Sequence, residues 1–163
     1  MIVREAVAAD LSEIVALQRE DVVREVHEDD VPVGAYRAAF DQISADAHQQ
    51  LLVGEVDGRV VATAQVTWIR RLTYVGGEMG VVESVRVRSD LRGRGLGERL
   101  MRHVVDLARA RGDVRLELTT NTQRRAARRF YERLGFVGSH VGMKLYLGPR
   151  SGPRSGPRSG GEA

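Results

Sequence analysis

The chain has 163 residues, of which 42% are hydrophobic and 29% are charged, and these values are typical of a single folded domain. It has no run near the roughly 18 apolar residues of a membrane helix, no signal-peptide pattern at its N-terminus, and no cysteine for disulfides or thiolate chemistry. The 25 basic side chains are nearly balanced by 22 acidic ones, which does not favour nucleic acid as a partner. We therefore expect a cytoplasmic protein with no membrane association.

Residues 148–163 repeat Gly-Pro-Arg-Ser and offer no apolar face. Because nothing in such a segment offsets the entropy cost of ordering it, we expect a folded domain over residues 1–147 followed by a flexible basic tail. The arginines of the tail leave two interpretations open, an inert extension and a weak binding arm for a nucleic acid or a protein.

At the start of the chain, residues 2–5 are expected to form a strand, and a helix follows. Asp10 is suited to be the N-cap of this helix, with Glu13 three residues later as the second member of a capping box. Pro32 is expected to open a second helix that runs toward His48, since proline is favoured in the first helical turn.

The next part of the chain predicts three strands. Two apolar runs, 51–56 and 60–69, flank Asp57-Gly58, a dipeptide that favours a tight hairpin turn with positive backbone φ angles. The two runs are therefore expected to be antiparallel neighbours. After a loop, residues 81–87 predict the third strand.

The last part of the chain alternates between helical and strand patterns. In chain order we expect a helix over Leu96–Arg111 ended by Gly112, a strand over Arg115–Leu118, a helix over 122–134, and two last strands near Phe136 and across 141–147. The complete order is β-α-α-β-β-β-α-β-α-β-β, which predicts an α/β fold.

The sharpest motif is the turn Arg92-Gly93-Arg94-Gly95-Leu96-Gly97, placed directly between a predicted strand and a predicted helix. A turn without Cβ atoms can point several backbone N–H groups at one anion, and the helix dipole adds to the attraction. Glu98 follows where a nucleotide triphosphate loop needs Lys and then Ser or Thr, and the glycine spacing does not fit a dinucleotide fingerprint. The turn therefore predicts a phosphate cradle of another kind.

The remaining pattern, Arg-x-x-Gly-x-Gly after a strand, resembles the GNAT superfamily of acetyl-CoA-dependent N-acetyltransferases. Asn121 ahead of the next helix and the segment Phe130-Tyr131-Glu132-Arg133-Leu134-Gly135-Phe136 agree with the family's motifs. The specific motifs lie within residues 80–136, and the first 50 residues match in outline. The resemblance implies a mixed, mostly antiparallel sheet with helices on both faces, and acetyl transfer to a primary amine by direct attack in a ternary complex.

The resemblance also implies the contacts to the co-substrate. The main chain of Val85, Arg86 and Val87 would pair with the pantetheine arm, and Asn121 would contact coenzyme A or instead cap the next helix. The backbone N–H groups of the cradle would hold the pyrophosphate, namely those of Arg92, Gly93, Arg94, Gly95, Leu96, Gly97 and Glu98. Six arginines face two acidic residues between positions 86 and 102, a balance that suits a polyanion.

Two residues are candidates for proton transfer. An amine must lose a proton before it attacks, and Glu83 is the candidate base, because strand alternation would place it among Val81, Val85 and Val87, where burial raises a carboxyl pKa. Alternatively, Glu83 is a structural residue, and an ordered water accepts the proton of the amine. By resemblance, Tyr131 would protonate the leaving thiolate, although it can also be a core aromatic. The amide N–H of Val85 would donate to the acetyl oxygen.

The acceptor and the partners are less well defined by the sequence. Residues 20–30 hold six acidic residues against one arginine, which suggests a small cationic amine as the acceptor or, alternatively, a solvated acidic helix face. Protein N-termini and lysines remain open as acceptors, and an acetyl-CoA sensor without turnover remains open as a function. No histidine spacing predicts a metal site. A homodimer is compatible with the family but is not decided by the sequence.

Overall fold

The computed structural model describes residues 1–20, 29–112, 115–145 and 147. These residues form one five-stranded sheet in the order β1-β2-β3-β4-β5, in which β1 to β4 are antiparallel neighbours and β5 pairs parallel with β4. The strands are β1 (Ile2–Glu5), β2 (Gln49–Val56), β3 (Arg59–Arg70), β4 (Glu78–Val87) and β5 (Arg115–Leu118). This mixed, mostly antiparallel sheet confirms the predicted fold class.

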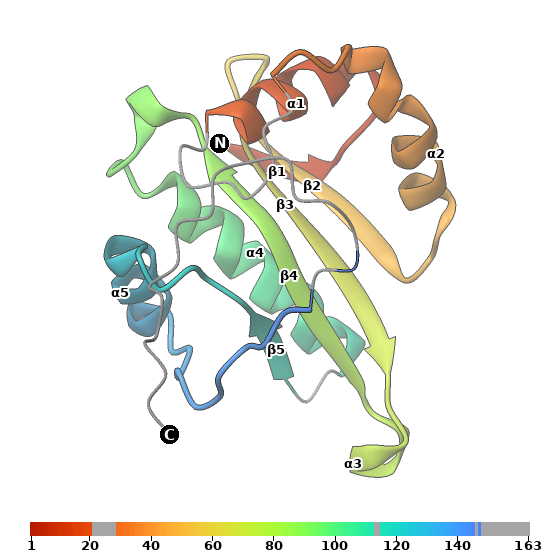
Figure 1. Cartoon of the computed structure of the whole chain (residues 1–163), viewed down its shortest axis with the longest axis vertical. Coiled ribbons are helices and arrows are strands. Elements are labelled where there is room, and N and C mark those ends of the chain that lie inside the picture. The colour runs from red at the N-terminus through yellow and green to blue at the C-terminus, as the bar shows by residue number, and fades with distance from the viewer. Residues whose placement is uncertain (21–28, 113–114, 146, 148–163) are drawn as a thin grey trace, which may run out of the picture.

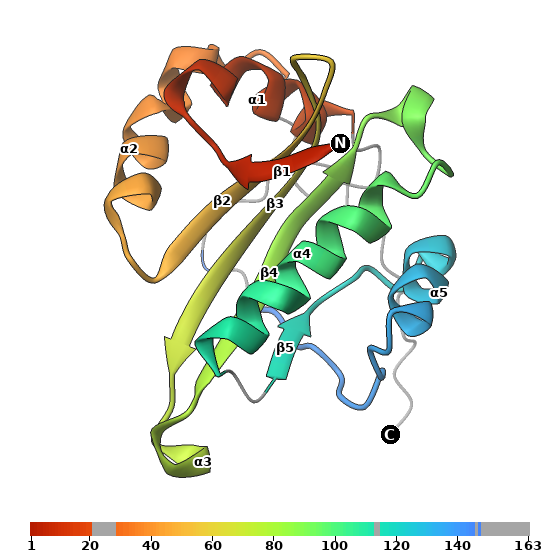
Figure 2. The same cartoon turned by 180° about the vertical axis from the view of Figure 1, so that it is seen from behind.

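Helices cover both faces of the sheet (Figures 1 and 2). The helices are α1 (Leu11–Arg19), α2 (Arg37–Ala45), α3 (Thr73–Gly76), α4 (Leu96–Arg111) and α5 (Arg125–Arg133), with 3-10 turns over Ala8–Asp10, Val33–Tyr36 and Ser89–Leu91. Leu52 packs in one cluster with residues of α4, whereas its neighbour Val53 packs with α1. Since successive strand residues point to opposite faces, α4 and α1 lie on opposite sides of the sheet.

Elements that depend on local sequence are confirmed. Asp57 and Gly58 have φ angles of 51° and 74° and join β2 to β3 as the predicted hairpin turn. Gly112, with φ of 75°, ends α4 at the predicted residue. Positive φ is accessible to glycine without a Cβ penalty, so these turns are encoded by the residues that make them.

Two predicted helices are longer than the observed ones. The helix expected to reach His48 ends at Ala45, because the Asp46 side chain accepts the N–H of His48 at 2.8 Å and turns the chain into β2. The helix expected from residue 122 begins at Arg125, after a turn built by Asn121. In both cases a short polar side chain competes with the helix for backbone N–H groups.

The two last predicted strands are not formed by the described residues 136–145 and 147. The apolar side chains that suggested them are exposed by 81% to 94%, namely those of Val137, Val141, Met143, Leu145 and Leu147. β5 pairs with β4 alone within the described chain. A strand requires a partner whose backbone satisfies its N–H and C=O groups, and an apolar alternation does not supply that partner.

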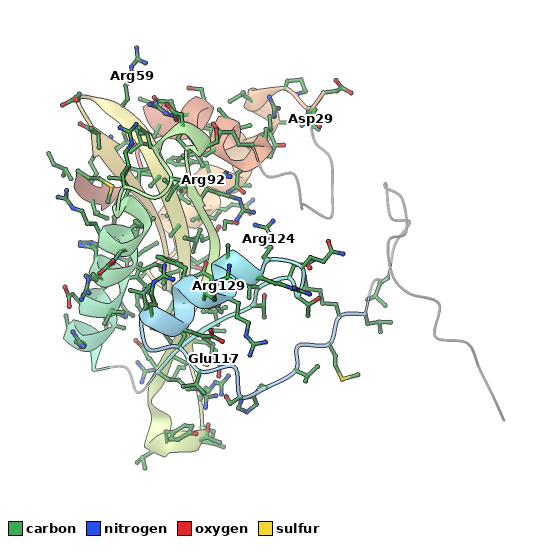
Figure 3. The ribbon with its side chains drawn as sticks, turned by 90° about the vertical axis from the view of Figure 1, so that its left-hand side faces the viewer. Asp29, Arg59, Arg92, Glu117, Arg124 and Arg129 are labelled. Atoms are coloured by element: carbon green, nitrogen blue, oxygen red, sulfur yellow. The ribbon has the colours of Figure 1, made fainter. Side chains whose placement is uncertain are left out.

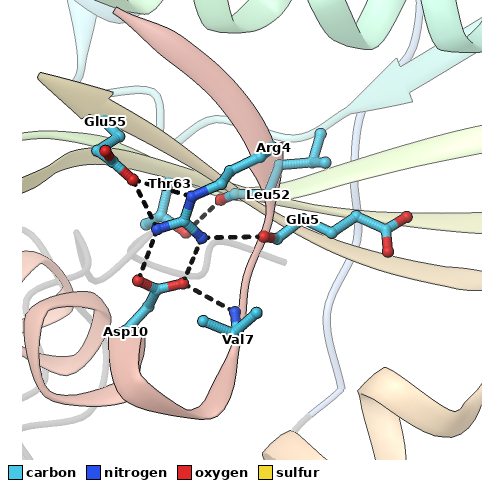
Figure 4. Close-up of polar contacts among 7 residues, drawn as sticks. All are labelled: Arg4, Glu5, Val7, Asp10, Leu52, Glu55 and Thr63. Carbon is cyan, nitrogen blue, oxygen red and sulfur yellow. Dashed lines mark hydrogen bonds and ion pairs between the residues drawn. The ribbon is translucent and has the colours of Figure 1, made fainter. Parts of the chain in front are cut away.

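Asp10 lies immediately before α1 as predicted, but its side chain does not cap that helix. The carboxylate instead accepts the N–H of Val7 at 2.8 Å and two N–H groups of Arg4 at 2.7 and 2.9 Å (Figure 4). Arg4 also donates to Glu55 at 2.9 Å. These bonds tie the start of the chain to β2, and the guanidinium of Arg4 holds the pKa of Asp10 below its ordinary value.

We expect Arg4→Met to lower the free energy of unfolding by about 2 kcal/mol at pH 7. Removing one partner of a fully buried pair costs about 3–5 kcal/mol. We expect less because the Arg4 side chain is 33% exposed, whereas the Asp10 side chain is 7% exposed. Urea denaturation measures the difference.

The stability that the Arg4–Asp10 pair contributes depends on pH. A carboxyl group with a lowered folded pKa contributes stability above its unfolded pKa of about 3.9 and loses it as the pH falls through the folded value. The deficit of Arg4→Met should therefore shrink at pH 2 to 3. Arg37→Met is the matched control, because Arg37 pairs with Asp41 on the surface, where such pairs contribute about 0.3–0.5 kcal/mol. Equal losses in both variants would contradict the role of Arg4.

Candidate functional site

The glycine-rich turn leads from β4 into α4 in a conformation that exposes backbone N–H groups. Gly93 and Gly95 both have φ of 77°, and a Cβ at either position would meet nothing within 4 Å. Gly95 is the N-cap of α4, and no side chain caps the helix. Its first helical bond runs from the N–H of Arg99 to the carbonyl of Gly95 at 3.0 Å. The N–H groups of residues 96–98 are therefore without helical partners and can bind an anion.

Gly97 allows three elements to meet at the cradle. A Cβ at this position would lie 3.4 Å from Cγ2 of Val87 and 3.5 Å from Cζ of Phe130. The first turn of α4 is thus in contact distance of both the end of β4 and the side of α5. A larger side chain at Gly97 would have to displace one of them.

The arginines around the cradle divide into two groups. The Arg92 Nε donates to the carbonyl of Val87 at 3.1 Å, which fixes its stem at the end of β4, and Arg94 is exposed on the turn. Arg99 donates to the carbonyl of Met1 at 2.8 Å, and Arg102 pairs with Glu98 at 2.7 Å. The guanidinium groups of Arg99 and Arg102 are thus already bound within the protein when no ligand is present.

β4 carries a bulge directly before the segment that was predicted to bind pantetheine. Ser84 has φ of 52°, and the register with β3 shifts between the pairs Gln65↔Glu83 and Thr63↔Arg86. A bulge leaves an unpaired residue and reverses the alternation of the strand. The reversal explains why Val82 and Val85 both pack on the side of α4.

The other edge of β4 becomes free at the same place. Its parallel pairing with β5 ends at Val82↔Leu118, and no strand within the described ranges pairs with that edge beyond Val82. Figures 1 and 2 show the chain leaving β5 toward α5 while β4 continues. The backbone of Val85 to Val87 therefore has an open edge that an extended ligand can pair with, although Arg86 donates to the Val85 carbonyl at 2.9 Å.

Glu83 does not lie where strand alternation placed it. The bulge separates it from Val85 and Val87, which pack toward α4, and the Glu83 side chain is exposed. The expectation of a carboxylate buried among valines is therefore wrong. No residue type around Ser84 indicates the bulge, so sequence reasoning had no signal for the reversal.

Tyr131 is half-buried in α5 beside two other aromatic rings. Its ring centroid lies 5.1 Å from that of Phe130 and 5.9 Å from that of Phe136. Burial raises the pKa of the Tyr131 phenol above its ordinary value, and the positive charges of Arg86 and Arg124 oppose this rise. The hydroxyl therefore stays protonated at neutral pH and can act as a proton donor.

Arg124 was not among the predicted site residues. It occupies the N-cap position of α5 and lies close enough to Tyr131 for its charge to act on the phenol. Seven residues, or about two helical turns, separate the two positions, so helical spacing could have placed them on one face. This spacing is the sequence signal from which Arg124 could have been predicted as a neighbour of Tyr131.

Asn121 shapes the turn before α5. Its Oδ1 accepts the N–H of Gln123 at 2.9 Å, and its carbonyl accepts the N–H of Arg124 at 2.9 Å. The Asn121 side chain thus stabilises a turn three residues ahead of the N-cap position of α5. This role resembles the predicted alternative, in which Asn121 caps the helix. Neither bond uses the Asn121 side-chain NH2 group, which keeps its donors for a ligand.

Other predicted features fall partly outside the described residues. Of the acidic segment 20–30, residues 21–28 lie outside them, whereas Asp29 and Asp30 are exposed. The tail 148–163 also lies outside. Within the ranges that are described, no cluster of three or more His, Cys, Asp or Glu residues could hold a metal, and no helix is long and apolar enough to span a bilayer.

Comparisons with known proteins agree with this geometry. Residues 12–136 match the family described as acetyltransferase (GNAT) family. Glucosamine 6-phosphate N-acetyltransferase 1 of Oryza sativa subsp. japonica is 37% identical over 115 residues, which are 69% of this chain and 68% of the rice protein.

Solved structures share the fold. A transcriptional regulator from Bacillus halodurans C-125 is 38% identical, with a TM-score of 0.83, covering 90% of this chain and 99% of the regulator. Glucosamine-6-phosphate N-acetyltransferase from Arabidopsis thaliana is 22% identical, with a TM-score of 0.74, covering 90% and 98% of the two chains. At that identity the second likeness concerns the fold alone.

Proposed function

Since the chain belongs to the GNAT family of acetyl-CoA-dependent N-acetyltransferases, we propose that it acetylates a primary amine of a small molecule by direct attack in a ternary complex. The observation that carries the proposal is the open edge of β4 between the cradle and Tyr131. A rice relative named as a glucosamine 6-phosphate N-acetyltransferase supports a small amine as the acceptor.

The residues present fit acetyl-CoA. The uncapped N-terminus of α4 suits the pyrophosphate, held by the backbone N–H groups of residues 93–98, whereas the N–H of Arg92 already donates to the Ser89 carbonyl at 3.4 Å. The open edge of Val85 to Val87 suits the amide groups of pantetheine, and the Asn121 side-chain NH2 donates no hydrogen bond to the residues that the structure describes. When bound, acetyl-CoA supplies an activated acetyl thioester. The N–H of Val85, next to the bulge, is proposed to donate to the acetyl oxygen.

Glu83 is proposed as the group that accepts the proton of the acceptor amine. It lies on the strand face opposite Val82, beside the bulge, and its exposed carboxylate can reach a solvent-borne amine directly or through one water. An ordered water acting alone is the alternative.

We expect Glu83→Gln to lower kcat/KM for the acceptor by about 100-fold or more at neutral pH, the usual contribution of a general base. Glu117→Gln is the control, because Glu117 is a β5 carboxylate bound to Arg115 at 2.7 Å. If Glu83→Gln keeps its rate within about threefold, water alone accepts the proton.

A screen of amines tests the proposed function. Thiol release can be followed without background, because the chain has no cysteine. Amino sugars, polyamines, amino acids and peptides with free N-termini or lysines are compared at equal concentration. Faster turnover of small amines than of peptides supports the proposal, and a preference for dications over monocations of equal length supports a cationic acceptor near Asp29 and Asp30.

A regulatory role is the second candidate function. It is favoured by the structure from Bacillus halodurans C-125, which is described as a transcriptional regulator and is 38% identical to this chain. Such a module would bind acetyl-CoA without turnover. Binding with no thiol release for any amine in the screen would favour it over the enzyme.

A further inference from the structure

α5 carries an unusual charge for its position. Between residues 124 and 133 it has one acidic residue, Glu132, and five arginines, namely Arg124, Arg125, Arg128, Arg129 and Arg133. Arg128 pairs with Glu132 at 2.8 Å, but among the residues that the structure describes neither Arg125 nor Arg129 has a side-chain partner. Both of these side chains are exposed.

The arrangement of these two arginines is unfavourable in the free protein. Arg125 and Arg129 are spaced i,i+4, so two like charges stand on one edge of the helix. Arg125 also lies in the first turn of α5, where the helix dipole favours anions, and that turn contains no acidic residue. A bound anion would reverse both effects.

The helix that carries Arg125 and Arg129 touches the cradle through Phe130. Phe130, the neighbour of Arg129, approaches the Cβ position of Gly97 to 3.5 Å. Figure 3 views this side of the molecule and shows the turn with Arg92 directly above α5, with Arg124 and Arg129 on the helix below it. Arg128 differs from these two arginines in its contacts, because its guanidinium pairs with Glu132 and its Nη2 lies 3.6 Å from the Cβ position of Gly138.

We propose that Arg125 and Arg129 form a second phosphate subsite, which binds the ribose 3′-phosphate of coenzyme A. The inference rests on the proposed placement of the pyrophosphate at the cradle. A phosphate monoester carries about −1.5 to −2 charges at pH 7, more than the cradle's N–H groups can neutralise together with the pyrophosphate. Two guanidinium groups offer fixed donor pairs that match phosphate oxygens.

The test compares two ligands, acetyl-CoA and 3′-dephospho-acetyl-CoA, by calorimetric titration of the full chain. For wild type we expect at least about tenfold tighter binding of acetyl-CoA, because charge-assisted hydrogen bonds to the 3′-phosphate are lost with the dephospho ligand. In Arg125→Gln/Arg129→Gln the affinity for acetyl-CoA should fall to that for the dephospho ligand. The affinity for the dephospho ligand should stay within twofold of wild type.

Two controls separate the subsite from other effects. Arg109→Gln/Arg128→Gln removes the same charge from two arginines that pair with Asp106 and Glu132, so it should preserve the preference for acetyl-CoA. The free Arg125→Gln/Arg129→Gln protein should melt at the wild-type temperature or above it, because two repelling charges are gone.

Three outcomes decide against the subsite. If wild type binds both ligands equally well, the subsite is wrong but the proposed function stands. The same conclusion follows if Arg125→Gln/Arg129→Gln loses affinity equally for both ligands. Failure of wild type to bind either ligand overturns the proposed function and the subsite with it.

Discussion

Gly95→Glu should raise the dissociation constant for acetyl-CoA by at least 100-fold. The residue is the N-cap of α4, and a Cβ there points into open space at the mouth of the cradle. A carboxylate at this point would face the pyrophosphate, and two like charges about 4 Å apart repel by about 4 kcal/mol at an effective dielectric constant of 20. Calorimetric titration with acetyl-CoA measures the loss directly.

Backbone strain needs a separate control, because Gly95 has φ of 77° and glutamate is disfavoured there by about 1–2 kcal/mol. Gly112→Glu provides it. Gly112 has φ of 75°, an equally open Cβ position, and lies at the opposite end of the same helix. It should lose similar stability and keep its affinity for acetyl-CoA. Comparable loss of affinity in both variants would mean that the cradle does not hold the ligand.

Tyr131→Phe should lower kcat by about 100-fold to 1,000-fold and change the KM for acetyl-CoA little. General acid catalysis contributes about 10²- to 10⁴-fold, and the loss of one hydroxyl leaves the ring packing with Phe130 and Phe136 intact. Steady-state kinetics with a saturating amine give both constants. Because burial raises the pKa of Tyr131, its titration should place no alkaline limit on the rate below about pH 10.

Tyr74→Phe is the control for this prediction. Tyr74 is 59% exposed on the β3–β4 hairpin, and its hydroxyl accepts a hydrogen bond from Arg115 at 3.2 Å. We expect a wild-type rate for Tyr74→Phe. Retention of full kcat in Tyr131→Phe would remove the phenol from the chemistry and leave it as a packing residue.

Features encoded by local residues could be predicted from the sequence. The Asp57-Gly58 turn, the bounds of α4 and the uncapped glycine cradle depend on φ preferences and apolar spacing within a few residues. The GNAT motifs within residues 80–136 were recognised for the same reason, since the residues that carry them are contiguous in the chain. The open glycine-rich turn before α4 could thus be predicted from the sequence, and its phosphate ligand stays a prediction.

Features that depend on contacts between distant segments were decided by the tertiary structure. The bulge at Ser84 arises from the register of β4 on β3, and it moved Glu83 from a predicted buried site to an exposed face. Asp10 bonds to Arg4 instead of capping α1, because folding brings a guanidinium within 2.7 Å of it.

Contacts between distant segments also decided the conformation of the C-terminal segment and the environment of Tyr131. Apolar residues at every second position of 141–147 predict a strand, but a strand also requires a partner edge, which no residue pattern can supply. The charge of Arg86 acts on Tyr131 only because β4 and α5 pack together. Sequence alone determined the Asp57-Gly58 turn, the limits of α4 and the glycine-rich turn before it, whereas the fold decided which charged groups surround Tyr131, since electrostatic effects depend on distance through space.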